Sequence, residues 1–332
     1  MSGAREAQSV FTPFAQHSSA GGARVRPFEL DPVPAMTLVR TTARGLLLTT
    51  CALLLAAGAA AASAEAAVPQ LVFPVLGEVS YIDDFGDPRV QGSHEGNDIM
   101  APRWAPVVAA EAGKVTFWTT SPRAGCMLYL YGKSGTTYMY IHLNDRPRGN
   151  GTSGGCVSGV AYAPGLKSGA TVAAGQLIGF NGNSGDAART GTHTQFEVHP
   201  GGGGPVNPYP YLRRARRLLF TAPVGSTFTL ALKGRVAGAA GQDLQVAVDQ
   251  VRRWPGGLKV KQAGQKVGVT VPETATIEGA PTAALPEFPS LDLLTRGLSV
   301  TVFTEPATVT FAALSGAKGT LAASRIVVAS TP

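Results

Sequence analysis

The sequence predicts an all-β protein, with a folded antiparallel β-sheet core and an open groove, followed by a small C-terminal β-barrel or sandwich. Glycine and proline are abundant, at 41 and 24 of 332 residues, and charged residues make up only 15%. This composition suits short strands joined by turns better than long helices. Hydrophobic residues reach 44%, which is enough for one or two cores.

The first 64 residues are predicted to lie outside the mature fold. Residues 1–35 lack hydrophobic periodicity, and Met36 offers a second start, so we interpret 1–35 as a candidate over-extended N-terminus. Residues 36–64 join Arg40 and Arg44 to an apolar run that ends in small residues, which is typical of a secretory signal peptide. The alternative is a transmembrane anchor. We favour cleavage, and therefore expect a secreted or extracytoplasmic protein without a stable membrane anchor.

Residues 68–212 are predicted to form the first β domain. Several segments there are rich in β-branched and aromatic residues, and glycines mark the turns between them. The candidate strands are 106–110, 113–119, 127–131, 136–143, 176–180 and 192–199. The segment 144–166 is longer than a hairpin turn requires, and we expect it to form a wall of a cleft.

A second β domain is predicted at 226–332, after a basic linker at 213–225. Its candidate strands are 227–230, 244–248, 267–271, 299–303, 308–311 and 325–328. Residues 266–271 also have the look of a strand in an oligonucleotide/oligosaccharide-binding barrel. This domain contains no histidine or cysteine. It could target the protein to a wall, seal the groove or stabilise the fold.

The charge balance is mildly basic and does not indicate nucleic-acid binding. The whole chain carries +7, and removal of residues 1–64, with five arginines and three acids, leaves +5. This charge suits work beside anionic polymers and equally suits ordinary solubility. The short run Arg213 to Arg217 fits a solvated linker face, and no nucleic-acid motif accompanies it.

Two cysteines, Cys126 and Cys156, remain after signal cleavage. Because an exported protein meets an oxidising compartment, we predict a disulfide between them; two buried thiols are the alternative.

The stretch Gly92-Ser93-His94-Glu95-Gly96-Asn97-Asp98 places a histidine and a carboxylate four residues apart. An imidazole nitrogen and a carboxylate oxygen are a donor pair for a first-row metal, most often zinc. Alone, this spacing is weak evidence.

Two later stretches strengthen the prediction of a metal or acid–base site. His142 ends the aromatic segment 138–143, and the alternating segment 191–199 puts His193, Gln195, Glu197 and His199 on one strand face. Four of the five histidines therefore lie between His94 and His199. His199 lies four residues beyond Gln195, or about 13 Å along the strand, which is too far to replace it without a bulge. We therefore expect an edge histidine and not a ligand.

These motifs resemble the lysostaphin-type (LytM-like) zinc metallopeptidases, which cut peptidoglycan cross-links. The family pattern is H-x-x-x-D, a histidine after an aromatic strand, and H-x-H followed by Phe-Glu. The resemblance covers about residues 70–212 and includes the segments 73–75, 84–89, 169–172 and 175–179. It implies zinc ligands at His94 and Asp98, catalytic residues at His142 and His193, and peptidoglycan peptides as the substrate.

The chain departs from the family at the third zinc ligand, where Gln195 replaces the histidine. An amide oxygen is a weaker zinc donor than an imidazole nitrogen, so zinc binding is expected to be weak or absent. A second departure is Trp104, which stands where the family commonly has a glycine turn; it could narrow the groove, stack on a sugar or simply pack.

Three functions remain open at the level of sequence. The chain could be an active zinc endopeptidase that tolerates Gln195. It could be a catalytically inactive relative that binds peptidoglycan or regulates another cell-wall hydrolase. It could also be a purely structural scaffold.

Overall fold

The computed structural model describes residues 67–329, apart from 91, 150 and 280–290. The predicted signal peptide and the candidate over-extended N-terminus lie outside these residues. No helix in the described part of the chain is long and apolar enough to span a membrane.

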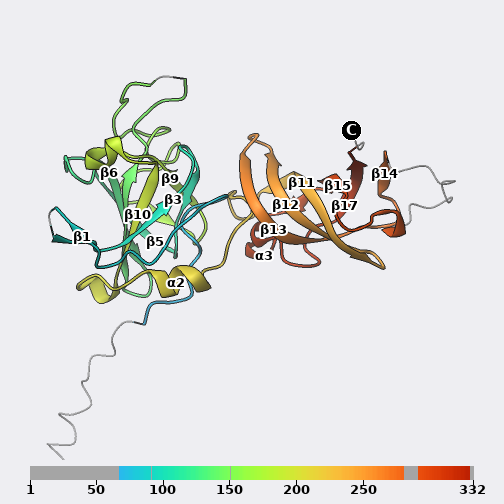
Figure 1. Cartoon of the computed structure of the whole chain (residues 1–332), viewed down its shortest axis with the longest axis horizontal. Coiled ribbons are helices and arrows are strands. Elements are labelled where there is room, and N and C mark those ends of the chain that lie inside the picture. The colour runs from blue at the N-terminus through green and yellow to red at the C-terminus, as the bar shows by residue number, and fades with distance from the viewer. Residues whose placement is uncertain (1–66, 91, 150, 280–290, 330–332) are drawn as a thin grey trace, which may run out of the picture. The chain divides into compact units, whose positions relative to one another are not determined.

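The predicted all-β class is confirmed, with an antiparallel sheet in the first half and a separate mixed sheet in the second (Figure 1). The first sheet has six strands in the order β3-β10-β7-β6-β5-β8. Their bounds are β3 (Asn97–Met100), β10 (His193–His199), β7 (Thr137–Leu143), β6 (Cys126–Gly132), β5 (Gly113–Trp118) and β8 (Thr171–Val172).

Shorter elements complete this half of the chain. Strands β1 (Pro88–Arg89) and β2 (Gly92–Ser93) form a two-stranded ribbon, and β4 (Pro106–Val108) pairs with β9 (Leu177–Phe180). The short helices are η1 (Gly185–Arg189), η2 (Pro200–Gly202) and α2 (Tyr209–Arg214).

The two faces of the first sheet differ as the alternation of its strands predicts. In β10, Thr194, Phe196 and Val198 are fully buried, and Phe196 packs 5.2 Å and 5.9 Å, ring centre to ring centre, from Tyr140 and Tyr138 of β7. Because side chains alternate along a strand, His193, Gln195, Glu197 and His199 project from the opposite face. One face therefore carries the core, and the other carries the predicted site.

The second half contains a seven-stranded sheet in the order β13-β12-β11-β15-β17-β14, with β16 beside β11. All pairs are antiparallel except β14 with β17. The elements are β11 (Thr227–Ala240), β12 (Asp243–Trp254), β13 (Lys259–Thr270), β14 (Thr276–Glu278), η3 (Leu291–Leu293), β15 (Ser299–Thr304), β16 (Ala307–Thr308), α3 (Phe311–Ser315) and β17 (Ala323–Val328).

One local prediction in this half is wrong. The segment 308–311 was expected to be a strand, but β16 ends at Thr308 and helix α3 begins at Phe311. The Thr310 hydroxyl accepts a hydrogen bond from the Ala313 amide, and Gly316 closes the helix in a left-handed conformation. These two caps outweigh the strand preference of a β-branched segment.

Candidate metal centre and active site

His94 and Asp98 form a buried donor pair at the edge of the first sheet. His94 follows β2 and Asp98 lies in β3, and Nε2 of the histidine is 3.2 Å from Oδ1 of the aspartate. Both atoms are buried and have no hydrogen-bond partner among the described residues. Two zinc ligands held at about 2.0–2.1 Å from an ion in a tetrahedral site lie roughly 3.3 Å apart. The pair therefore fits a metal ion, which would satisfy both atoms.

Gly96 allows these two residues to share one site. A Cβ at this position would lie 2.7 Å from the backbone oxygen of Phe196 and 2.9 Å from Cγ of Glu197. The glycine is thus required by the close approach of the chain to β10, and any larger residue would push β3 away from its neighbour.

The His94 ring is oriented by Asp84. Nδ1 of His94 lies 2.9 Å from the Asp84 backbone oxygen and donates to it, because a carbonyl oxygen only accepts. This contact turns Nε2 toward Asp98, as a backbone carbonyl commonly does when it binds the other nitrogen of a metal-bound histidine. Burial alone would lower the pKa of His94, but the carboxylates of Asp84 and Asp98 raise it to about 10. A metal ion at Nε2 must therefore displace a proton at neutral pH.

Asp98 is held ionised by the cations around it. Burial by itself would raise its pKa, but the 3.2 Å contact with the His94 imidazole and the charges of His193, His94 and Arg89 lower it to about 2. Arg89 donates from Nη2 to Oδ2 of Asp98 at 2.9 Å. The two carboxylate oxygens are thus divided, with Oδ2 used by the guanidinium and Oδ1 left for the metal position.

A second group of donor atoms, from Asp84, His94 and Asp98, lies within 4.8 Å of one another. Nη2 of Arg89 lies 3.6 Å from Oδ2 of Asp84, 3.0 Å from Nδ1 of His94 and 2.9 Å from Oδ2 of Asp98. The Arg89 guanidinium therefore already occupies the space between these three donor atoms. The better metal position lies between Nε2 of His94 and Oδ1 of Asp98.

His193 reaches the same point from β10. Its Nε2 lies 3.7 Å from Oδ1 of Asp98, and its Nδ1 donates to the backbone oxygen of Gly191 at 2.8 Å. The carbonyl contact fixes the tautomer, so that Nε2 carries the lone pair in the neutral ring.

His142 reaches the site only because its backbone is unusual. Strict alternation in β7 would put it on the core face with Tyr138 and Tyr140. Its φ of 61° breaks this alternation, and its ring centre lies 5.1 Å from that of His193. A left-handed conformation is uncommon outside glycine and is found preferentially where function requires it.

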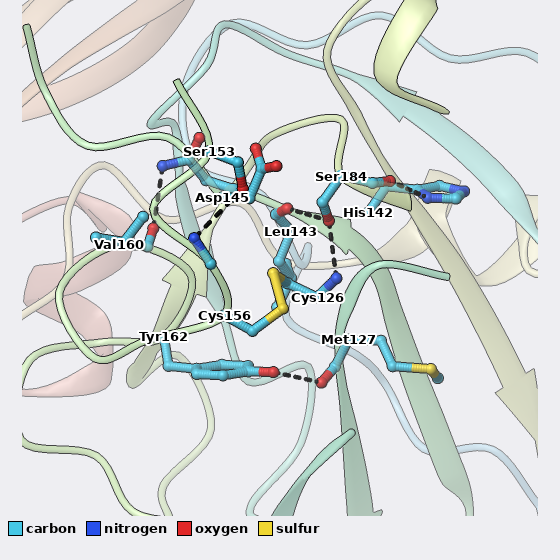
Figure 2. The surroundings of a disulfide bond; sticks show 12 residues. Cys126, Met127, His142, Leu143, Asp145, Ser153, Cys156, Val160, Tyr162 and Ser184 are labelled. Carbon is cyan, nitrogen blue, oxygen red and sulfur yellow. Dashed lines mark hydrogen bonds between the residues drawn. A yellow bond between two sulfur atoms is a disulfide. The ribbon is translucent and has the colours of Figure 1, made fainter. Parts of the chain in front are cut away.

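Ser184 holds the His142 ring in place (Figure 2). Nδ1 of His142 donates to the Ser184 backbone oxygen at 2.9 Å. The Ser184 hydroxyl accepts from the Cys126 amide at 2.8 Å and donates to the Leu143 backbone oxygen at 2.6 Å. Burial, and then the charge of His193, lower the pKa of His142. This imidazole is therefore suited to accept a proton at neutral pH.

Gln195 lies opposite Asp98 in the pairing of β10 with β3. Its Nε2 donates to Oε1 of Glu197 at 2.7 Å, and Oε2 of Glu197 lies 2.9 Å from Nε2 of His199. Because a carboxylate only accepts, the Gln195 amide has its nitrogen toward Glu197. The amide oxygen is then the atom that remains for a metal.

His199 is excluded as a ligand by its own contacts. Its Nε2 is paired with Glu197, and its Nδ1 donates to the backbone oxygen of Gly203 at 2.9 Å. Both ring nitrogens are thus used within the protein, and the His199 side chain is buried.

The predicted site residues line one cavity of about 830 Å³. His94, Asp98, His142, His193 and Gln195 are all among its walls. The sequence pointed to these five residues but missed Arg89, Asp84 and Ser184. Arg89 and Asp84 fall in a segment that already showed family resemblance, and Ser184 carried no signal of its own.

Part of the chain is similar to a known protein family. Residues 92–208 match peptidase family M23. The matched segment contains His94, Asp98, His142 and His193.

One curated protein is similar to part of this chain. The L-Ala--D-Glu endopeptidase of Bacillus subtilis is 28% identical over 155 residues, which cover 43% of each chain. The matched segment therefore spans less than half the length of this curated relative.

Two solved structures are also similar to this part of the chain. The catalytic domain of lysostaphin from Staphylococcus simulans is 24% identical, with a TM-score of 0.32, and the match covers 41% of this chain and 92% of that one. A variant of the catalytic domain of the M23 protein EnpA from Enterococcus faecalis is 26% identical, with a TM-score of 0.31, and covers 41% and 94%.

Proposed function

We propose that this chain is an exported cell-wall protein whose M23-like domain binds zinc and hydrolyses peptide bonds in peptidoglycan. His94, Asp98 and Gln195 would hold the metal, and His142 and His193 would be the catalytic pair. The observation that carries the proposal is the buried pair of Nε2 of His94 and Oδ1 of Asp98, which lie 3.2 Å apart and have no hydrogen-bond partner among the described residues. The predicted signal peptide at 36–64 supports export.

The chemistry divides between the metal and the two imidazoles. Zinc, when bound, lowers the pKa of a coordinated water toward 7 and polarises the peptide carbonyl. His142, whose pKa is lowered by burial, accepts a proton from the attacking water at Nε2. His193, beside Asp98, stabilises the negative charge on the carbonyl oxygen or gives a proton to the leaving amine. The products are a carboxylate and a free amine.

Gln195 also favours a second candidate function, a catalytically inactive protein that binds peptidoglycan or regulates another cell-wall hydrolase. Its amide nitrogen is committed to Glu197, and an amide oxygen is a weak zinc donor. In addition, Arg89 already neutralises part of the Asp98 charge. Both features lower the expected affinity for zinc.

Metal content and cleavage separate the two candidates. Purified residues 65–332 are expected to hold about one zinc per chain by elemental analysis and to release soluble peptides from purified sacculi. Absence of both zinc and cleavage would contradict the peptidase proposal. Sedimentation with sacculi under those conditions would support the second candidate.

The substitution Gln195→His tests the third donor directly. It restores an imidazole, so zinc affinity and cleavage are expected to rise by at least tenfold. Gln195→Leu, which removes the donor oxygen while keeping the side chain similar in size, serves as the matched control and should bind less zinc than the natural chain. Equal zinc affinity in all three proteins would show that position 195 is not a ligand.

A further inference from the structure

A second cavity, of about 450 Å³, is lined by three arginines and one tryptophan. Arg103 and Trp104 precede β4, and Arg146 and Arg148 follow β7. None of these four residues lines the cavity of the proposed metal site. We propose that this arginine pocket binds an oxyanion, either a carboxylate or a phosphate group of a ligand.

Arg103 is the fixed cation of the arginine pocket. Its Nη1 donates to Oδ1 of Asn144 at 2.9 Å, and its Nη2 donates to Oδ1 of Asn183. Asn183 is itself held by the backbone oxygens of Ala188 and Thr190. Because neutral amides fix this guanidinium, its position is set while its charge is not cancelled.

The positive charge of the pocket exceeds its negative charge. Oδ1 of Asp145 lies 3.9 Å from both Arg103 and Arg146, beyond hydrogen-bond distance, and has no hydrogen-bond partner among the described residues. Burial, and then the neighbouring charge of Arg146, lower the pKa of Arg103. One carboxylate is thus shared between two guanidinium groups, and Arg148 adds a third positive charge. An anion would relieve this repulsion.

Trp104 presents Arg148 to the pocket. The guanidinium carbon of Arg148 lies 4.4 Å from the centre of the Trp104 ring. The centre of the Trp104 ring also lies 5.1 Å from that of the Phe180 ring. This cation–π contact holds the Arg148 guanidinium at the pocket without a carboxylate that would cancel its charge.

The backbone at Trp104 supports a functional role. Its φ is 71°, in the left-handed region that favours glycine, so a bulky side chain is held there in a strained conformation. Trp104 instead places a large ring at the position where the family that the motifs resemble commonly has a glycine turn. The strain is explained if the ring is needed to hold Arg148.

The loop that carries Arg146 and Arg148 is tied at both ends. Strand β7 ends at Leu143, and the disulfide between Cys126 and Cys156 anchors the other side of the loop to β6 (Figure 2). The arginines are therefore partly pre-organised, which reduces the entropy cost of binding.

Titration with inorganic phosphate and with glutarate tests this proposal in the metal-depleted protein. The indole N–H signal of Trp104, assigned with Trp104→Phe among the three tryptophans, reports binding by NMR. We expect saturable shifts with at least one probe. A response to phosphate alone identifies a phosphate ligand, and a response to glutarate alone identifies a carboxylate ligand.

The double variant Arg146→Gln, Arg148→Gln should weaken binding at least fivefold. The matched control is Arg213→Gln, Arg214→Gln, which removes the same charge from exposed positions on α2 and should leave the Kd unchanged. His94→Gln should also leave it unchanged, since that residue belongs to the metal position. The proposal is overturned if neither probe shifts the Trp104 signal, or if the pocket variant and the charge control bind alike.

Discussion

At the scale of single residues, the site depends on which ring nitrogen each histidine offers. His94, His142 and His193 all place Nδ1 within 2.8–2.9 Å of a backbone carbonyl oxygen. Each carbonyl acts as an acceptor, so the Nε2 atoms remain for the reaction or the metal. The same tautomer is thus imposed on three histidines by three separate backbone segments.

The protonation of His94 predicts how metal binding and stability change with pH. Its pKa is about 10, raised above the ordinary value of 6.5. The proton competes with zinc, so zinc affinity should rise by up to about tenfold per pH unit between pH 7 and 9. Calorimetric titration of zinc across this range measures it, and an affinity independent of pH would contradict the assignment.

In the metal-free protein, a rise in pH is expected to lower the free energy of unfolding, whereas it raises the affinity for zinc. A raised pKa stabilises the fold below the unfolded value near 6.5, and this contribution is lost as pH rises toward 10. Urea unfolding in EDTA should therefore show a decline in the free energy of unfolding from pH 7 to 10. The decline should be smaller in His94→Gln, which cannot titrate.

Ser184 offers a test of how His142 is positioned. Ser184→Ala leaves the Cys126 amide and the Leu143 carbonyl without their buried partner, and should destabilise the fold by about 1–3 kcal/mol. If the protein is active, the acidic limb of its pH profile should shift as the environment of His142 changes. Ser184→Thr, which keeps the hydroxyl, should largely restore both properties. Ser184→Ala with natural stability would contradict the role assigned to this hydroxyl.

At the scale of elements, the site is set by how closely β3 approaches β10. Residues Asp98 and Gln195 are direct partners in that pairing. The approach depends on the absence of a side chain at Gly96. Strand register, and not only local sequence, therefore decides which donor atoms meet.

Gly96→Ala tests this dependence. The added methyl group would lie 2.7 Å from the Phe196 oxygen, and the strain should cost about 1–3 kcal/mol and separate β3 from β10. Thermal unfolding and zinc content measure both effects. Gly204→Ala is the matched control, because a Cβ there meets nothing within 4 Å. Equal effects of the two substitutions would show that β3 and β10 do not depend on the missing side chain at Gly96.

At the scale of the whole molecule, one covalent bond joins the loop after β7, which lines the arginine pocket, to strand β6 of the first sheet. The predicted disulfide between Cys126 and Cys156 is confirmed, and the two residues are 30 positions apart. The Cys126 amide also donates a hydrogen bond to the Ser184 hydroxyl. Ser184 in turn accepts a hydrogen bond from the His142 ring, so the disulfide is linked to the position of His142 through one residue.

Removal of this disulfide should lower stability more than it alters the fold. Closing a loop of this length is worth about 3.7 kcal/mol. Cys126→Ala with Cys156→Ala should therefore unfold at lower urea concentration, while its circular dichroism spectrum stays β-rich. Reduction of the natural protein should reproduce the effect, and an unchanged midpoint in both would contradict it.

The second sheet has no counterpart in the matched family segment, which ends at residue 208. Its predicted boundaries at 226–332, and the proposed roles in wall targeting, groove sealing or stabilisation, remain predictions. Sacculus binding by the chain with and without this region would separate the first role from the third.

The sequence by itself was enough to predict the β class, the disulfide pair and the five residues that line the cavity of the proposed metal site. Alternation of side chains and motif spacing are local properties, so they can be read from the order of residues. His142 shows the limit of such reasoning, since alternation would have assigned it to the core face. Only the tertiary structure decided its exposure to the site, through the left-handed turn of its backbone.

The same holds for the groups that hold the site in place. Arg89, Asp84, Ser184 and Gly96 act through contacts with residues from other segments, and no spacing in the sequence states those contacts. The arginine pocket likewise joins two segments more than 40 residues apart. Distances between remote segments arise only when the chain packs, because packing and strand register, and not local preference, bring those atoms together.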